Sequence, residues 1–270
     1  MNSACALVAC IPLWLGSSLL AQSSQDFALF NANSRQTAIW YLNGVTYAGG
    51  AYVQTALTGW SLQRAGDFNA DGNPDFVIFK ATTGQTAIWY LYGPWFWSSV
   101  YGPTLPSGWA LQAVRDFDAD GNPDFVLFNA STRRTAIWYL DGVRYMSSVY
   151  GPTLPSGWAL QSAADFNADG KPDFVLFNAS TGQTAIWYLD GVRYISSEYG
   201  PTLPSGWALQ FARDFNADGK PDFAIFEATT GQTAIWYLYG PWFWSSVYGP
   251  TLPTDWTLQA VDDFGTPPGL

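Results

Sequence analysis

The chain has 270 residues, of which 18% are aromatic and 12% are charged, and its formal net charge is −10. A chain this apolar can bury a large core, so the composition argues against an intrinsically disordered protein. The acidic balance and the lack of a basic patch also argue against nucleic acid as a partner.

The chain begins with a segment that predicts a secretory leader. An apolar run over residues 4–20 is followed by Ala21-Gln22-Ser23, which is typical of a small-residue cleavage site. We therefore expect a signal peptide over 1–23, a mature domain over 24–270 and a secreted, extracellular or cell-surface location. Leu7-Val8-Ala9-Cys10 also resembles a lipoprotein lipobox, so lipidation of Cys10 stays open. No later segment is apolar for long enough to span a membrane.

A 49-residue repeat fills the rest of the chain. Tryptophans in the motif T-A-I-W-Y-L recur at this step as Trp40, Trp89, Trp138, Trp187 and Trp236. A second series, in the motif G-W-x-L-Q, comprises Trp60, Trp109, Trp158, Trp207 and Trp256. Uniform spacing favours a closed ring in which every unit fills the same wedge.

One unit, residues 109–157, predicts four strands. They are expected at 109–115, 125–128, 135–140 and 143–149, the second as a continuous apolar run and the third as a β-branched and aromatic one. Asp141-Gly142 predicts a two-residue hairpin between the third and fourth strands. The Gly- and Pro-rich segment 151–157 is predicted to end the sheet and cross to the next unit. Five such units predict an all-β fold, a five-bladed β-propeller of four-stranded antiparallel blades.

The two ends of the mature domain complement each other. Residues 26–30 align with the second strand of a unit, and residues 256–264 align with a first strand. Pairing them would complete the fifth blade and leave no open sheet edge. The first strand is expected to be innermost, with a ring of glutamines near the axis that hydrogen-bond between blades: Gln63, Gln112, Gln161, Gln210 and Gln259.

Each intact unit also carries an acidic loop of the form D-x-[D/N]-x-D-G-x-P-D. Its side chains offer oxygens at positions 1, 3, 5 and 9, and position 7 would add a backbone carbonyl. Oxygen-only ligands on a pliable loop favour Ca²⁺, and the alternative is a metal-free Asx turn. The predicted metal-binding residues are Asp67, Asn69, Asp71, Asn73 and Asp75; Asp116, Asp118, Asp120, Asn122 and Asp124; Asp165, Asn167, Asp169, Lys171 and Asp173; and Asp214, Asn216, Asp218, Lys220 and Asp222.

The loops account for the acidity of the chain, since they hold 13 of its 21 acidic residues. Four calcium ions would add eight positive charges to the −10 of the chain and leave it near −2. The fifth loop is divided between Asp263 and Asp26 and lacks its middle carboxylates, so we expect about four structural Ca²⁺ sites and a fifth that is empty or weak.

These motifs resemble a known repeat family. The sequence D-F-N-A-D-G-K-P-D-F-V-L-F followed by T-G-Q-T-A-I-W-Y-L-D-G is similar to FG-GAP/VCBS repeats, and the resemblance covers residues 24–264. The family includes the integrin α-chain head and a fungal propeller lectin. The Phe-Gly and Gly-Ala-Pro elements are not evident, so the bacterial VCBS-like branch fits better, and five blades depart from the seven that are common in the family. The resemblance implies a secreted calcium-binding propeller used in adhesion or carbohydrate recognition.

The residue inventory argues against an enzyme. The chain has no histidine, and both of its cysteines precede residue 24. Ser-His-Asp and Cys-His nucleophiles and the usual zinc sites are therefore excluded. A carboxylate pair for glycoside hydrolysis remains open, but nearly all aspartates belong to the loops. We expect a protein without catalytic activity.

Aromatic residues on the fourth strand mark a candidate ligand site. Phe96 and Phe243 occupy a position that is aromatic in every unit and is expected to be buried, and their neighbours Trp95, Trp97, Trp242 and Trp244 should face the other way. These tryptophans either stack on sugars or a partner, or pack between blades. Two functions follow: a lectin-like carbohydrate-binding module, or an adhesion or scaffold module that binds extracellular protein. The oligomeric state stays open.

Overall fold

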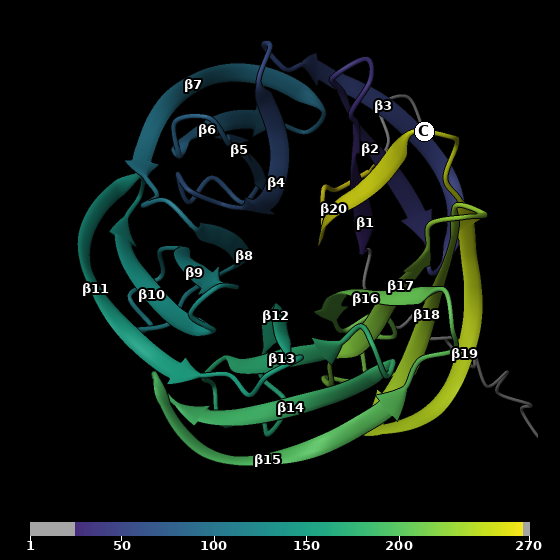
Figure 1. Ribbon diagram of the computed structural model, residues 1–270. Helices are drawn as coiled ribbons and strands as arrows, with labels where there is room; N and C mark the ends of the chain where they lie inside the picture. Colours follow the sequence, from purple (N-terminus) through teal and green to yellow (C-terminus); the bar gives the residue numbers. More distant parts are fainter. Residues whose placement is uncertain (1–24, 267–270) are drawn as a thin grey trace, which may run out of the picture.

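The computed structural model describes residues 25–266, so the predicted leader 1–23 lies outside the described residues. Within this range twenty strands form five four-stranded antiparallel sheets arranged in a ring (Figure 1). The predicted five-bladed propeller is confirmed. No helix that could cross a membrane is present between residues 25 and 266.

Each blade uses its strands in the predicted order from the axis outwards. The innermost strands are β4 (Trp60–Gly66), β8 (Trp109–Arg115), β12 (Ala159–Ala164), β16 (Trp207–Arg213) and β20 (Trp256–Asp262). The second strands are β1 (Asp26–Asn31), β5 (Asp75–Lys80), β9 (Asp124–Asn129), β13 (Asp173–Asn178) and β17 (Asp222–Glu227). The third strands are β2 (Gln36–Asn43), β6 (Gln85–Tyr92), β10 (Arg134–Asp141), β14 (Gln183–Asp190) and β18 (Gln232–Tyr239). The outermost strands are β3 (Thr46–Thr55), β7 (Trp95–Thr104), β11 (Arg144–Thr153), β15 (Arg193–Thr202) and β19 (Trp242–Thr251).

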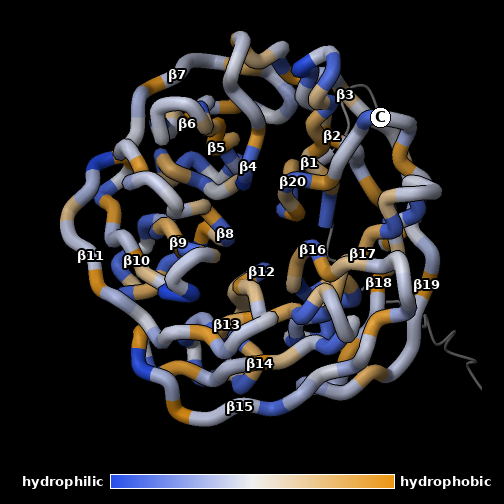
Figure 2. The backbone as a smooth tube through the Cα atoms, viewed as in Figure 1, coloured by the Kyte–Doolittle hydropathy of each residue, from blue (hydrophilic) through white to orange (hydrophobic). Residues whose placement is uncertain are grey.

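The hydrophobic core consists of the surfaces between neighbouring blades. The second strand is buried on both faces, as β9 illustrates with every residue from Asp124 to Asn129 buried. One core cluster joins Val77 and Ile88 of one blade to Phe125 and Leu127 of the next, and the other clusters repeat this arrangement. Hydrophobic stretches therefore run along the strands of each blade, as the tube in Figure 2 shows.

The predicted closure by the two chain ends is observed. β20 pairs antiparallel with β1, with Phe27 opposite Val261 and Asp26 opposite Asp262. This pair completes the sheet β20-β1-β2-β3, so the innermost and second strands of the fifth blade come from opposite ends of the chain. Every inner strand contains the same β-bulge, which in β4 falls between Leu62 and Arg64.

The bulge explains the recurring glutamines and corrects their expected role. Gln63 and its equivalents are the bulged residues, and they are half-buried near the axis. The amides of Gln63 and Gln259 donate to hydroxyls of their own strands, at 2.9 Å to Ser61 and 2.8 Å to Thr257. Among these glutamines, within residues 25–266, only the side chain of Gln112 forms a hydrogen bond across blades, accepting from Arg64 at 3.4 Å. Bonding between blades is therefore not the rule for this position in residues 25–266.

The outermost strand is longer than the sequence predicts. β11 continues through Gly151 and Pro152 to Thr153, where a crossover was expected. An outer edge strand tolerates proline because no neighbour needs its missing N–H group. Gly151 packs so closely that a Cβ atom there would lie 2.5 Å from the Oγ1 atom of Thr135, and that hydroxyl donates a 2.7 Å hydrogen bond to the carbonyl of Pro152. Glycine and proline thus extend the sheet here instead of ending it.

Candidate calcium loops and aromatic pockets

The last aspartate of each acidic loop connects the loop to the sheet. Asp124 is fully buried, and its two carboxylate oxygens accept hydrogen bonds from the N–H groups of Phe117 (2.8 Å) and Leu140 (2.9 Å). The same pair of bonds is made by Asp75, Asp173 and Asp222. Each oxygen keeps a further lone pair, so metal binding at position 9 stays a prediction beside this structural role.

The same contact closes the ring across the chain ends. Asp26 accepts hydrogen bonds from Leu42 (2.8 Å) and from Phe264 (3.1 Å), which lies 238 residues further along the chain. The Phe264 ring then packs edge-on against Phe76 of the next blade, with ring centroids 5.7 Å apart. Asp26 and Phe264 therefore form, between the two ends of the chain, the contact that a single acidic loop forms in the other blades.

Burial changes the acidity of these aspartates. It raises the pKa of Asp26, Asp75 and Asp222 to about 7, and that of Asp124 and Asp173 to about 6, while the backbone N–H groups act in the opposite direction. Neighbouring carboxylates of the same loop raise the pKa further because like charges repel.

The side chains at positions 1, 3 and 5 come together at the surface. Carboxylate oxygens of Asp116, Asp118 and Asp120 lie within 4.8 Å of one another, an arrangement that could hold a metal ion. The loop backbone wraps around the first of them, since Asp116 accepts hydrogen bonds from the N–H groups of Ala119 (2.7 Å) and Gly121 (2.9 Å). Burial and the charges of the other two carboxylates raise the pKa of Asp118, so a cation would relieve repulsion here.

The other intact loops share this geometry with asparagine at position 3. Asp67 accepts from Gly72 at 2.8 Å, and Asp165 and Asp214 accept from the equivalent glycines at the same distance. In each loop the residue at position 4 is an alanine with a positive φ between 56° and 61°, and the glycine after position 5 has a φ between 82° and 88°. This left-handed backbone turns the loop sharply and brings the oxygens of positions 1, 3 and 5 to one side.

Position 7 offers only its carbonyl in two of the loops. The ammonium of Lys171 forms an ion pair with Asp190, and that of Lys220 lies over the ring of Tyr239 at 5.0 Å from its centroid. Both lysine side chains are therefore directed to partners beyond the loop. A donor set of carboxylate, amide and carbonyl oxygens fits a hard divalent cation such as Ca²⁺.

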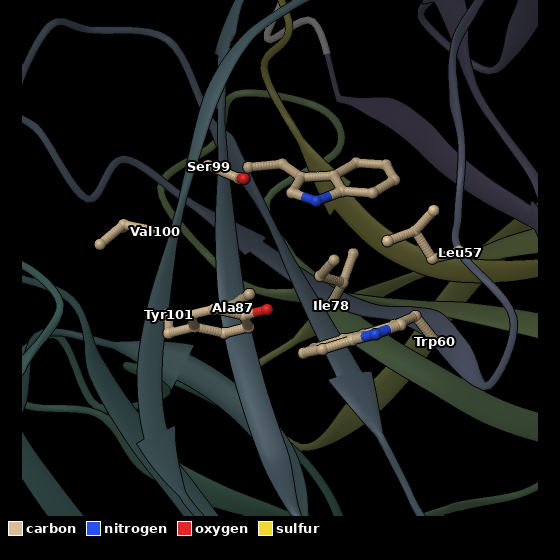
Figure 3. A pocket seen from close by; sticks show the side chains of 8 residues that line it. Leu57, Trp60, Ile78, Ala87, Ser99, Val100 and Tyr101 are labelled. Atoms are coloured by element: carbon tan, nitrogen blue, oxygen red, sulfur yellow. The ribbon is translucent and has the colours of Figure 1, made fainter.

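A second kind of site, which no single sequence motif indicates, lies at the opposite end of the blades. Three equivalent pockets of about 140, 170 and 180 Å³ occur in the blades that begin with β4, β12 and β16. In the first, Trp60 of the innermost strand and Tyr101 of the outermost strand reach toward each other over Ile78 and Ala87 of the middle strands (Figure 3). Trp89 lines the same pocket, and Leu57 comes from the crossover.

The aromatic pair of this pocket is present in all five blades. Ring centroids of Trp60 and Tyr101 lie 6.2 Å apart, and the equivalent pairs, Trp109 with Tyr150, Trp158 with Tyr199, Trp207 with Tyr248 and Trp256 with Tyr52, lie 6.1 to 6.2 Å apart. The small side chain of Ala87, and of the equivalent alanine in the other pockets, leaves space between the two rings. The recurrence of both residues is visible in the sequence, but their approach across four strands is not.

The four tryptophans predicted as ligand residues are exposed on the outer strands. Trp97 and Trp244 are 79% and 77% exposed, and Trp95 and Trp242 are about 60% exposed, so packing between blades does not cover them. The residue between each pair is predicted to be buried; Phe96 is partly buried, whereas Phe243 is 47% exposed. It instead packs edge-on against Trp236. Trp97 also lines a 370 Å³ pocket together with Asn69 and Asp71, which places it beside the first acidic loop.

The comparisons with known proteins identify a family. The FG-GAP-like repeat model matches residues 67–127, 116–176 and 165–225, and each match starts at the first aspartate of an acidic loop. No curated protein matches the chain.

Several solved structures are similar to the chain at low sequence identity. The chain is similar to a protein of unknown function from Bacteroides caccae (12% identity, TM-score 0.46, covering 83% of this chain and 73% of that one). It is also similar to the Photorhabdus luminescens Tc holotoxin pore (17%, 0.44, 86% and 13%) and to a luciferin-regenerating enzyme (10%, 0.49, 84% and 77%). These values carry no argument about function, and the VCBS-like branch stays a prediction. Because the family model covers more than half of the sequence, the chain belongs to the FG-GAP-like repeat family.

Proposed function

We propose that this protein is a secreted, calcium-stabilised binding module without catalytic activity, and that it holds carbohydrate in the aromatic pockets of its blades. The observation that supports this function best is the fivefold recurrence of the tryptophan–tyrosine pair. A repeated site suits a ligand that is itself repetitive, as a polysaccharide is.

The chemistry of the pocket suits a sugar ring. Pyranose rings present an apolar C–H face that packs on aromatic rings, while their hydroxyl groups need polar partners at the edge. Trp60, Trp89 and Tyr101 supply aromatic faces, and Ser99 supplies a hydroxyl. The equivalent pocket in the blade that begins with β12 adds the carboxylate of Glu198. Volumes of 140 to 180 Å³ suit one sugar unit better than a larger ligand.

Several weak sites on one molecule can give a strong interaction. When one pocket is occupied, the next sugar of a chain reaches its pocket at a high effective concentration, so overall affinity can exceed that of a single site by about 10²–10⁴-fold. We therefore expect weak binding of monosaccharides and much tighter retention on a polysaccharide.

A glycan array followed by affinity electrophoresis tests the proposal. Tyr101, Tyr199 and Tyr248 are more than 70% exposed, so their replacement by alanine removes pocket walls and little core. The triple tyrosine variant should lose binding. Two tryptophan variants, Trp97→Ala plus Trp244→Ala and Trp95→Ala plus Trp242→Ala, change the start of the outermost strands, away from the pockets, and serve as matched controls; they are called the outer-strand variants below. If the outer-strand variants lose binding instead, the sugar site lies at the tryptophans that the sequence predicts. Absence of binding to every glycan would contradict the carbohydrate proposal.

The second candidate function is an adhesion or scaffold module that binds extracellular protein. The exposed pairs Trp95 with Trp97 and Trp242 with Trp244 favour it, since large exposed aromatics commonly mark protein contacts. Loss of protein binding in the outer-strand variants, without any glycan binding by the parent protein, would support this function.

The calcium part of the proposal has its own test. At millimolar Ca²⁺, each loop of extracellular-type affinity would add about 1–2 kcal/mol to the free energy of unfolding. Titration of Ca²⁺ into chelator-treated protein should raise the melting temperature and should show about four binding events by calorimetry. An unchanged melting temperature would remove calcium from the proposal.

The secretion part of the proposal has a separate test. Determination of the N-terminal residue of the exported protein would test cleavage after residue 23.

A further inference from the structure

Two positions on the innermost strands differ from blade to blade, although the strands around them repeat the same motifs. The first position carries Arg64, Ala113, Ser162, Phe211 and Ala260. The second carries Gly66, Arg115, Ala164, Arg213 and Asp262. Because the innermost strands surround the axis (Figure 1), large side chains at these positions meet there and must complement one another. Five identical side chains could not do so, least of all five like charges.

The result is a concentration of positive charge in an acidic protein. Three of the chain's 11 basic residues, Arg64, Arg115 and Arg213, line one cavity on the axis. Among residues 25–266 their one ion pair is a 2.8 Å contact between Arg213 and Asp262. Three guanidinium groups and one carboxylate leave two positive charges without a counter-ion of the chain.

The arginines are held in place by neutral groups. Arg64 donates 2.6 Å hydrogen bonds to the carbonyls of Gln112 and Gln63, and its guanidinium lies 5.4 Å from the ring centroid of Phe211. Arg115 donates to the carbonyl of Val114 at 2.8 Å. These contacts orient the guanidinium groups but do not neutralise their charge.

Burial makes this charge unfavourable. It lowers the pKa of Arg64 to about 10, and it lowers the pKa of Arg115 to about 9 with a further contribution from the charge of Arg213. Both values lie above neutral pH, so both side chains stay cationic. A small anion among them would offset their desolvation and their mutual repulsion.

The cavity has room for a small ion. Its volume is about 20 Å³, slightly more than one water molecule requires. Ser162 also lines it, is 3% exposed and accepts a 3.1 Å hydrogen bond from the N–H group of Ala212, so its own O–H can donate into the cavity. We propose that this axial cavity binds one small inorganic anion of the size of chloride, held by Arg64, Arg115 and Arg213. Such an ion would stabilise the ring by joining blades through their innermost strands.

Chloride dependence of the melting temperature tests the site. Protein in sodium gluconate is titrated with sodium chloride at constant ionic strength and constant calcium concentration. A saturable rise of about 2–4 °C is expected once chloride exceeds its Kd about fivefold. A melting temperature that does not depend on chloride would overturn the proposal, because water alone would then fill the cavity.

Two variants separate the site from general salt effects. Arg115→Gln should abolish the chloride-dependent rise, whereas Arg144→Gln, a matched change on an exposed outer strand, should leave it intact. Asp262→Asn removes the one axial carboxylate that pairs with an arginine, so it should lower the chloride concentration of half-saturation several-fold even if it lowers the starting melting temperature. An unchanged half-saturation point in Asp262→Asn together with an unchanged rise in Arg115→Gln would place the ion elsewhere.

A bromide soak locates the ion directly. Anomalous diffraction from crystals of the full chain should show one peak within hydrogen-bonding distance of the three guanidinium groups. Bromide peaks confined to the outer surface would contradict the proposal. A rise in melting temperature with sulfate but not with halide would also contradict it, because the site would then take a larger oxyanion.

Discussion

The aspartates of one acidic loop differ in their structural roles, and the role depends on the position of the aspartate within the loop. Asp173 is buried and accepts hydrogen bonds from two backbone N–H groups of the fold, whereas the carboxylate of Asp169 is exposed and accepts hydrogen bonds from Asn167 and Lys171 of its own loop. A calcium ion would compete with solvent at Asp169 but would share Asp173 with the backbone. The contribution of Asp173 to stability should therefore persist without metal.

We predict different losses of stability in the calcium-free protein for two matched substitutions. Asp173→Asn places an amide N–H against a backbone N–H and should lower the free energy of unfolding by about 1–3 kcal/mol even in chelator. Asp169→Asn should change the stability of chelated protein by less than about 0.5 kcal/mol but should reduce the stabilisation by calcium. Urea denaturation with and without Ca²⁺ measures both effects. Equal losses for the two variants in chelator would contradict this division of tasks.

The buried aspartates also predict a dependence on pH. In the calcium-free protein burial raises the pKa of Asp75 and Asp222 from 3.8 to about 7, so the folded state binds more protons than the unfolded state between these values. Stability should then fall as the pH rises from about 4 to about 7. Saturating calcium should reverse the trend, because protons compete with the metal for the same loops. Melting temperatures between pH 4.5 and 8, with chelator and with calcium, test both signs.

At the scale of the strand, close packing explains why glycine and proline extend the outermost strand. Gly102, Gly151, Gly200 and Gly249 each approach the threonine hydroxyl of the third strand so closely that a Cβ atom would lie 2.5 to 2.6 Å from it. In these four blades that hydroxyl donates to the carbonyl of the following proline, and in the fifth blade Thr37 donates to the carbonyl of Gln54. In β11 this side-chain contact lies at the bulge between the Ala136–Tyr150 and Arg134–Thr153 pairs, so it attaches the outer strand where the regular pairing is interrupted.

Replacement of one of these glycines should show the contact. Gly151→Ala should lower the free energy of unfolding by about 1–3 kcal/mol, because the new methyl group meets the Oγ1 atom of Thr135. In a double-mutant cycle with Thr135→Ala, which removes that oxygen, the two losses should be less than additive. Additive losses would indicate that the glycine is required for another reason.

At the scale of the molecule, the ring depends on its two ends. β20 and β1 supply the innermost and second strands of one blade, and Asp26 and Phe264 complete a loop connection between them. The core between this blade and its neighbours includes Phe27, Leu29 and Phe264. Loss of either end therefore exposes both a strand edge and apolar side chains.

Truncation tests this closure. A chain that ends at residue 255 lacks β20 and leaves the N–H and C=O groups of β1 unpaired, so it should aggregate or pair with a second copy. A chain that ends at residue 266 is the matched control and should behave as the full chain does. Light scattering after gel filtration, together with thermal denaturation, distinguishes them. A monomeric truncated chain with the parent melting temperature would show that the ring does not need this strand.

Much of this architecture could be predicted from the sequence because it repeats. The equal spacing of Trp40 and its equivalents determined the number of blades, and the alignment of residues 26–30 and 256–264 with complementary strands determined the closure. The position of the acidic loops between first and second strands followed from the same register. Each of these features depends on contacts that are local or that recur at every step of the repeat.

The tertiary structure alone decided the features that join residues distant in sequence. Trp60 and Tyr101 lie in the first and fourth strands of a blade, and their rings approach each other across the two middle strands because the residue between them there is the small Ala87. Arg64, Arg115 and Arg213 come from three blades and meet because the ring closes around one axis. A repeat specifies what each unit contains, whereas the curvature of the assembled ring determines which side chains of different strands and units share one space.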